Sequence, residues 1–229
     1  SGLDYSTSYY VTIPAGFVVD QVGTNGNAAI AANEWSFTTG AEVVGDLFFS
    51  EYVEGSSNNK AVEIFNPTSG TVALSHYTIK KGTNGADFTT IFSPMGTLAA
   101  QTTFVIANSV AVAGILNVAD TIDAAGSVVF FNGDDAIGLF KDDVLIDVIG
   151  LTNGVDPGTA WPVAGVDNAT AEHTLIRKAS VTHGNTDWTA SAGTTAENSE
   201  WEVHPQDYIA NLGTHSTTLS SAAEILTFT

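Results

Sequence analysis

Acidic residues gather in short polar turns of this sequence, where their oxygens could bind a metal ion. The turns hold Asp134 and Asp135, Asp142 and Asp143, and Asp120 with Asp123. Calcium prefers carboxylate and carbonyl oxygens, and repulsion between carboxylates that converge at one end of a fold favours a cation there. None of these turns has the spacing of an EF-hand, and adjacent carboxylates in a turn usually face water. Asp134 and Asp135 are the first candidates for a calcium site.

No arrangement of residues typical of a catalytic site occurs in the sequence. Five histidines are dispersed, and no two have the His-x-x-x-His spacing of zinc ligands. The sequence has no cysteine, no Gly-x-Ser-x-Gly elbow and no glycine-rich phosphate loop with its lysine. Phosphodiester hydrolysis would need a convergent cluster of carboxylates and histidines, usually holding metal ions. We therefore assign no catalytic and no cofactor-binding residue, and we expect no enzymatic activity.

A polar, glycine-containing segment at residues 50–60 reads SEYVEGSSNNK and invites two interpretations. Its serine and asparagine groups could accept a ligand. The same side chains bond their own backbone in tight turns, and a strand has to connect to the next one somewhere. We favour the structural interpretation, in which Glu51 and Glu63 pair with Lys60 or with backbone donors.

Three tryptophans, Trp161, Trp188 and Trp201, lie in the late, loop-rich part of the chain. Exposed rings could stack on sugars or bases. A β-sandwich also needs large residues under its long loops, so buried packing is the favoured expectation. Trp188 is the ring whose exposure would decide between the two.

The composition describes an acidic chain that can still bury a core. Its 229 residues include 25 Asp and Glu against 6 Lys and Arg, for a net charge of -19, and 44% are hydrophobic. Binding nucleic acid requires clustered basic residues, which are missing here, so we expect no direct nucleic-acid binding. No stretch approaches the roughly 18 apolar residues of a membrane span. High negative charge keeps extracellular proteins soluble without defining a partner.

Short apolar runs separated by turns dominate the pattern and predict β-strands. Expected strands begin at 47–49 and cover residues 61–65, 103–106, 127–131, 136–140 and 144–149. Residues 141–143 are short enough to close a hairpin between the last two runs. Helix signals are weak: residues 110–116, with Ser109 as N-cap, and residues 206–212 could each form a short helix. The prediction is an all-β sandwich or barrel.

The two ends of the chain differ from its middle. Residues 1–41 have a strand rhythm of their own, residues 214–222 are polar, and residues 223–229 look like the beginning of another strand. We therefore expect a central domain at 43–213, part of another domain at 1–41, and a linker with the start of a following domain at 214–229. The chain looks like a segment of a longer protein.

Several motifs, in order, resemble the bacterial lamin tail domain. The opening motif at residues 46–66 is DLFFSEYVEGSSNNKAVEIFN, and FVIANS follows at 104–109, FNGDDA at 131–136 and IDVIG at 146–150. The segments TLIRK at 174–178 and 200–213 are similar to the end of the family's pattern. Residues 1–41, with YVTIPAG at 10–16 and WSFTT at 35–39, resemble the C-terminal part of a bacterial immunoglobulin-like domain of the SbsA type.

The resemblance implies an immunoglobulin-like β-sandwich in a secreted or cell-surface bacterial protein, often beside nuclease, phosphatase or other Ig-like domains. We expect a non-catalytic spacer or interaction module, with neighbouring domains, a protein, a glycan or a surface as partner. One alternative is an accessory domain of a secreted nuclease or phosphodiesterase. Another is a calcium-stiffened adhesin repeat, whose melting temperature would rise with millimolar Ca²⁺.

Overall fold

A computed structural model describes residues 7–23, 25–32, 34–38, 45–124 and 127–218 of the chain. The chain forms two compact units. The described parts of the first, the N-terminal unit, lie within residues 7–38. Those of the second, the sandwich unit, lie within residues 45–218. No helix in the described residues is long and apolar enough to cross a membrane.

The N-terminal unit contains a short antiparallel ribbon. Strand β1 (Ser8–Tyr10) pairs with β2 (Ser36–Thr38), and the Tyr9 ring stacks on Phe37 with centroids 5.8 Å apart. A two-stranded ribbon is at best marginally stable by itself, because it has no second layer to bury its apolar side chains. Phe17 and Val22 accordingly remain 74% and 77% exposed in the described structure.

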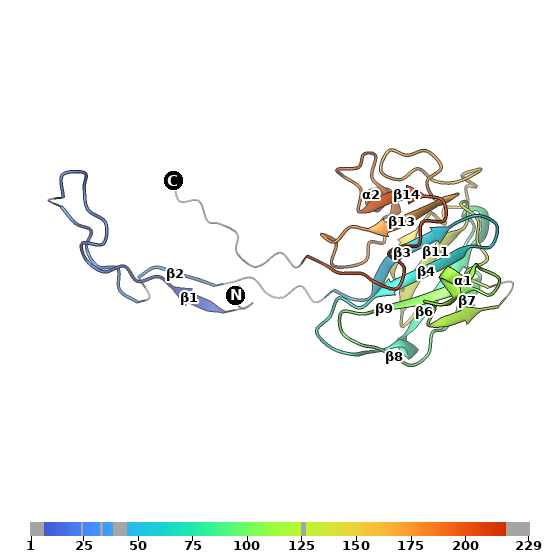
Figure 1. The fold of residues 1–229 in the computed structure, drawn as a ribbon, viewed down its shortest axis with the longest axis horizontal. Coiled ribbons are helices and arrows are strands. Elements are labelled where there is room, and N and C mark those ends of the chain that lie inside the picture. The colour runs from blue at the N-terminus through green and yellow to red at the C-terminus, as the bar shows by residue number, and fades with distance from the viewer. Residues whose placement is uncertain (1–6, 24, 33, 39–44, 125–126, 219–229) are drawn as a thin grey trace. The chain divides into compact units, whose positions relative to one another are not determined.

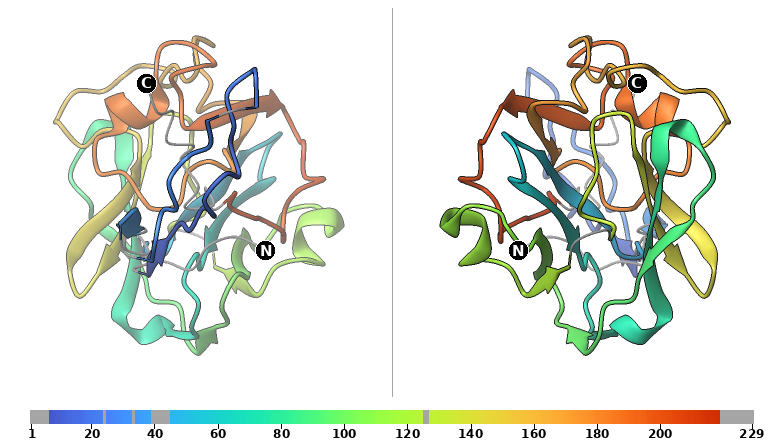
Figure 2. Two further views of the ribbon diagram at one scale, coloured as in Figure 1. Left: turned by 90° about the vertical axis from the view of Figure 1, so that its left-hand side faces the viewer. Right: turned by 90° about the vertical axis from the view of Figure 1, so that its right-hand side faces the viewer.

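The sandwich unit consists mainly of two β-sheets that pack face to face (Figures 1 and 2). Among the described residues, the larger sheet has six strands in the order β10 (Thr121–Asp123), β9 (Thr103–Asn108), β4 (Lys60–Phe65), β3 (Phe48–Glu54), β13 (His173–Arg177) and β14 (Trp201–Pro205). The smaller has four, in the order β12 (Val144–Ile149), β11 (Ala136–Lys141), β6 (Tyr77–Gly82) and β7 (Thr90–Phe92).

Shorter elements complete this unit. Strands β5 (Val72–Ala73) and β8 (Thr97–Leu98) pair with each other, and two 3₁₀ turns are η1 (Leu74–His76) and η2 (Thr83–Gly85). The helices are α1 (Ala113–Leu116) and α2 (Trp188–Ala192). After β14, residues 206–218 contain no helix or strand; we call them the C-terminal strap.

Apolar side chains fill both faces of the six-stranded sheet. The core between the two sheets includes Phe49, Tyr52, Ile79, Leu139 and Trp201. A second cluster on the outer face combines Val53 of β3, Val105 of β9 and Ile115 of α1 with Leu212 of the strap. The strap therefore covers part of a sheet face that would otherwise expose apolar side chains to water.

The structure confirms most of the expected strands. The hairpin forms as predicted, because Lys141 lies opposite Val144 and leaves a two-residue turn. The strand expected at residues 127–131 is wrong: these residues form turns, although Val128, Val129 and Phe131 are buried. The carboxylate of Asp123 accepts backbone hydrogen bonds from Val128 and Val129, which satisfies amides that a strand ladder would have paired.

Of the two predicted helices, the one at residues 110–116 is confirmed in part and the one at 206–212 is wrong. The first helix begins at Ala113, after an N-cap at Val112 that has no side-chain hydrogen bond, so Ser109 is not its cap. Residues 206–212 form no helix; instead, the carbonyl of Tyr208 accepts a hydrogen bond from the Thr174 hydroxyl (2.8 Å). Helix α2 was not predicted, although Asp187 caps its start by accepting from Ala190 N–H. The expected strand at 223–229 lies outside the described residues.

Candidate functional site

The polar segment at residues 50–60 lies at the β3–β4 hairpin and binds mainly to other parts of the sandwich unit. In its loop, one Asp207 oxygen accepts from Ser56 N–H (2.9 Å) and Asn59 Nδ2 (2.9 Å), and the other accepts from Ser56 Oγ (2.7 Å). A side chain at Gly55 would begin only 2.4 Å from the same Asp207 carboxylate. The loop residues therefore serve to attach the hairpin to the strap.

The end of the hairpin holds a buried ion pair between Lys60 Nζ and Glu54 Oε1. These residues are directly opposite each other in the β3–β4 register. The other oxygen of Glu54 accepts the backbone N–H of Glu172 (2.5 Å). The expectation that Lys60 pairs with Glu51 or Glu63 was wrong: Lys60 is three residues before Glu63 on β4, so the two side chains point to opposite faces of the sheet, and Lys60 lies opposite Glu54 instead.

Glu51 and Glu63 instead lie opposite each other on β3 and β4, and both are fully buried. Glu63 accepts hydrogen bonds from Ser50 Oγ (2.5 Å) and from the backbone N–H of Gly213 (2.6 Å), so its predicted backbone donor is confirmed. Glu51 accepts from Asn211 Nδ2 (3.3 Å). Burial raises the pKa of Glu51 to about 8 and that of Glu63 to about 7.

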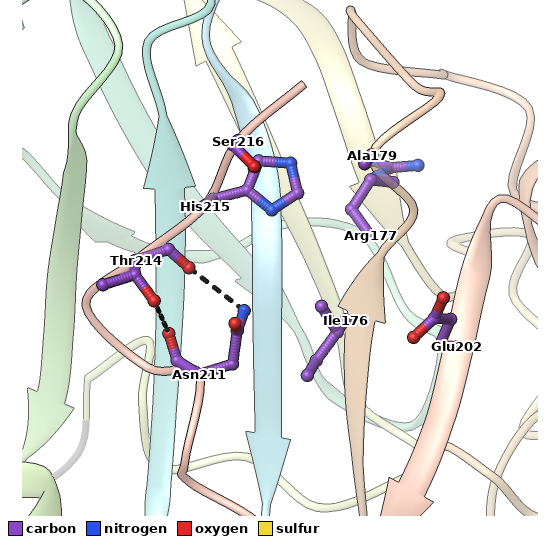
Figure 3. Close-up of a pocket in the computed structure, with 8 residues that line it drawn as sticks. All are labelled: Ile176, Arg177, Ala179, Glu202, Asn211, Thr214, His215 and Ser216. Atoms are coloured by element: carbon purple, nitrogen blue, oxygen red, sulfur yellow. Dashed lines mark hydrogen bonds between the residues drawn. The ribbon is translucent and has the colours of Figure 1, made fainter. Parts of the chain in front are cut away.

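The strap forms one wall of a small open pocket, and Asn211, the residue that donates to Glu51, lies in that wall (Figure 3). The pocket has a volume of about 330 Å³, and its other wall is formed by residues of β13 and β14, among them Ile176 and Glu202. His215 packs edge-on against Phe48 and Phe65, with ring centroids 5.8 and 4.9 Å away. Burial and the nearby Arg177 lower the pKa of His215 to about 4, so the ring is neutral near pH 7.

Arg177 is also among the residues that line this pocket, and its guanidinium is fully buried. It donates to Asp147 Oδ2 (2.5 Å), Glu200 Oε2 (2.6 Å), Ser191 Oγ (2.9 Å) and the Phe49 carbonyl (3.1 Å). Its guanidinium carbon lies 4.0 Å from the Trp201 ring centroid. All of these partners belong to the protein itself, and the arrangement therefore connects the two sheets with helix α2.

The predicted calcium candidates have different surroundings. Asp135 is buried, and its two oxygens accept the backbone N–H groups of Asn84 and Asn132, both at 3.0 Å, with Lys81 Nζ 3.8 Å away. Asp134 has one buried carboxylate oxygen without a hydrogen-bond partner, and burial raises its pKa. The described residues contain no group of three or more His, Asp or Glu placed to hold a metal ion. Calcium binding at Asp134 and Asp135 stays a prediction.

The three tryptophans of the late segment are all buried, with Trp188 only 2% exposed. Trp188 and Trp201 pack together with centroids 6.5 Å apart, and Trp201 Nε1 donates to Ser191 Oγ (2.9 Å). Packing beneath the loops is confirmed, and none of these rings offers a stacking platform for a sugar or a base.

Two packed, mainly antiparallel sheets with internally bonded polar groups define an immunoglobulin-like β-sandwich. Residues 41–153 match the family model of the lamin tail domain, and residues 1–39 match that of a bacterial Ig-like domain. Residues 41–153 therefore form a lamin tail domain, and a bacterial Ig-like segment precedes it in the chain. No curated protein matches this chain.

The folded sandwich extends beyond the matched residues. Strands β13 and β14, at residues 173–205, lie in the same six-stranded sheet as β3, β4 and β9. Strand β13 pairs directly with β3, in register from His173 opposite Glu54 to Ile176 opposite Glu51. The matched region and the later strands consequently share one hydrophobic core.

Proposed function

We propose that this chain is an extracellular spacer or interaction module of a larger secreted or surface protein, with no catalytic activity of its own. The observation that supports this best is the use of the polar segment at residues 50–60. Its Ser50 side chain bonds within the hairpin, to residue 63, and its Glu54, Ser56 and Asn59 side chains hold the hairpin to residues 172 and 207. A segment used in this way stabilises the module and leaves its outer surface for neighbouring domains, a protein, a glycan or a cell surface.

The proposal is tested by a hydrolysis assay on the dialysed 229-residue chain. Plasmid DNA and a chromogenic phosphodiester are incubated with the chain and with Mg²⁺ or Ca²⁺, and we expect the substrates to remain intact. Asp134→Asn is the matched variant, since Asp134 has the unpartnered carboxylate oxygen. Cleavage by the wild type that this substitution abolishes would contradict the non-catalytic role.

The choice of partner is tested separately by binding to glycans and to isolated cell envelopes. Because Trp161, Trp188 and Trp201 are buried, binding that depends on exposed tryptophan rings is not expected in the sandwich unit. Single-stranded DNA serves as the negative control, since a protein with a net charge of -19 repels the phosphates of DNA. Retention on DNA at physiological salt would contradict the proposed class of partner.

A further inference from the structure

We infer that Glu51 and Glu63 share one proton in the folded sandwich, and that loss of this proton releases the C-terminal strap from the sheet. The structure thus contains a pH-sensitive latch at the outer face of the six-stranded sheet.

The two side chains are forced together by strand register. Glu51 lies directly opposite Glu63, next to an irregularity between Phe49 and Glu51 that shifts the register of β3. Side chains in directly opposite positions of an antiparallel pair have Cβ atoms about 5 Å apart. Both residues have a relative exposure of 0%, so water does not separate their charges.

The four carboxyl oxygens of Glu51 and Glu63 have only three hydrogen-bond donors. Ser50 Oγ and Gly213 N–H donate to the two oxygens of Glu63, and Asn211 Nδ2 donates to Oε2 of Glu51. The remaining oxygen, Glu51 Oε1, is buried without a partner. A protonated carboxyl gains an O–H donor, so one proton on Glu51 Oε1 can complete the set by bonding to the adjacent carboxylate.

The charged groups around Glu51 and Glu63 also favour a proton on the pair, because none of them supplies a compensating positive charge. Asp120, whose carboxylate accepts Val105 N–H of β9, adds negative charge near Glu63. On the strap, His215 lies over the same sheet face but is neutral, because its pKa is lowered to about 4. On β13, Ile176 lies opposite Glu51, while Arg177 directs its guanidinium to Asp147 and Glu200. No described residue forms an ion pair with either carboxyl.

When the shared proton is lost, both Glu51 and Glu63 carry a negative charge. The strap is the part of the structure that responds to this second charge. Two of its residues, Asn211 and Gly213, donate to the pair, and Leu212 between them packs in the outer apolar cluster. Two adjacent buried carboxylates repel each other and lose their hydration. When the strap lifts, water reaches both groups. The pKa values near 8 and 7 exceed the ordinary 4.5, so the stabilisation is complete below about pH 4.5 and is lost as pH rises toward 8.

Hydrogen exchange of the full chain, read at the Gly213 amide and corrected for the intrinsic effect of pH, tests the latch. Between about pH 6 and pH 9 we expect its protection to fall at least about tenfold, since one pKa unit corresponds to a factor of ten. The amide of Val62 in β4 should keep its protection. In Glu51→Gln the amide group replaces the shared proton, so protection of Gly213 should stay high at every pH.

Glu197→Gln is the matched control, because it removes one negative charge at a fully exposed position. It should retain the pH dependence of the wild type. Protection of Gly213 that is independent of pH in the wild type, or that falls equally in Glu51→Gln, would overturn the inference. Restoration of protection at pH 9 by added Ca²⁺ would also overturn it, because the pair would then hold a cation.

A second measurement does not depend on any variant folding correctly. In wild-type protein, ¹³C NMR of the glutamate carboxyl carbons should show two signals that titrate above pH 6, coupled to each other. If every glutamate carboxyl titrates near its ordinary value of 4.5, the shared proton does not exist.

Discussion

At the scale of single residues, the sandwich unit buries several charged or ionisable side chains among its apolar ones. Buried charged or ionisable groups occur on both sheets: Glu51, Glu63 and Arg177 on the larger, and Asp147 on the smaller. Arg177 has full compensation from carboxylates, a hydroxyl and a carbonyl, whereas the glutamate pair has only neutral donors. These two arrangements should therefore respond differently to substitution and to pH.

Arg177→Met should lower the free energy of unfolding by about 3–5 kcal/mol, because it leaves the fully buried Asp147 carboxylate without its counter-charge. Urea denaturation monitored by tryptophan fluorescence measures the change. Glu200→Gln is the comparison, since that side chain is 27% exposed and water can replace its lost interaction. Equal losses in the two variants would contradict the assigned role of Asp147.

In the His215→Phe variant, the protein should lose less stability than the wild type when the pH falls from 6.5 toward 4. The ring keeps its packing on Phe48 and Phe65, but the group no longer titrates. In the wild type the folded pKa of about 4 lies below the ordinary 6.5, so stability from this group is complete above pH 6.5 and is lost toward pH 4.

The measurement for His215 is the difference in melting temperature between pH 7 and pH 5, which should be smaller in the variant. His183→Phe, at an exposed position, should behave as the wild type. If both substitutions reduce the difference equally, the effect does not come from burial under the strap.

At the scale of elements, local sequence accounts for the hairpins better than for the helices. The β11–β12 turn consists of Asp142 and Asp143, with φ of 46° and 63°, the left-handed values that a two-residue hairpin turn needs. Asp142 Oδ1 lies 2.9 Å from His76 Nδ1, and Asp143 Oδ1 accepts from Lys80 Nζ at 3.0 Å. Such exposed pairs add little to the free energy of unfolding, so the geometry of the turn itself explains why the hairpin forms.

Asp143→Gly should stabilise the protein by about 0.5–1 kcal/mol, because glycine adopts positive φ without the penalty of a Cβ atom. Loss of the ion pair with Lys80 should change the free energy of unfolding very little, since the Asp143 side chain is 87% exposed. Thermal unfolding measures the effect. Asp143→Ala keeps the Cβ atom and should be no more stable than the wild type; if it is equally stabilised, relief of negative charge is the cause.

At the scale of the whole molecule, the strap and the late strands make the sandwich unit larger than its matched region. Residues 173–218 supply two strands of the larger sheet and the cover of its outer face. The described parts of the N-terminal unit, by contrast, expose large apolar side chains such as Phe17 and Val22. The two units are expected to contribute very unequally to the stability of the chain.

Calcium binding is a prediction about the whole molecule, because a ligand that binds only the folded state raises its melting temperature. If Asp134 and Asp135 hold Ca²⁺, millimolar CaCl₂ should raise the melting temperature by a few degrees, and EDTA should reverse the change. Asp134→Asn is the variant that should abolish it. Asp143→Asn, in the exposed turn, should leave it intact. No shift with either Ca²⁺ or EDTA would contradict the site.

The sequence by itself determined the all-β class, most strands, the Asp142–Asp143 hairpin and the burial of the tryptophans, because these depend on local alternation, turn chemistry and size. It did not reveal the pairing of Glu51 with Glu63, the partners of Arg177 or the course of the strap. Those depend on a register shift in β3 and on contacts such as Gly213 with Glu63 and Arg177 with Phe49, which lie 150 and 128 residues apart in the chain. Local periodicity carries no information about such distant neighbours, so only the packed sheets decided which buried charges meet a partner and which must share a proton.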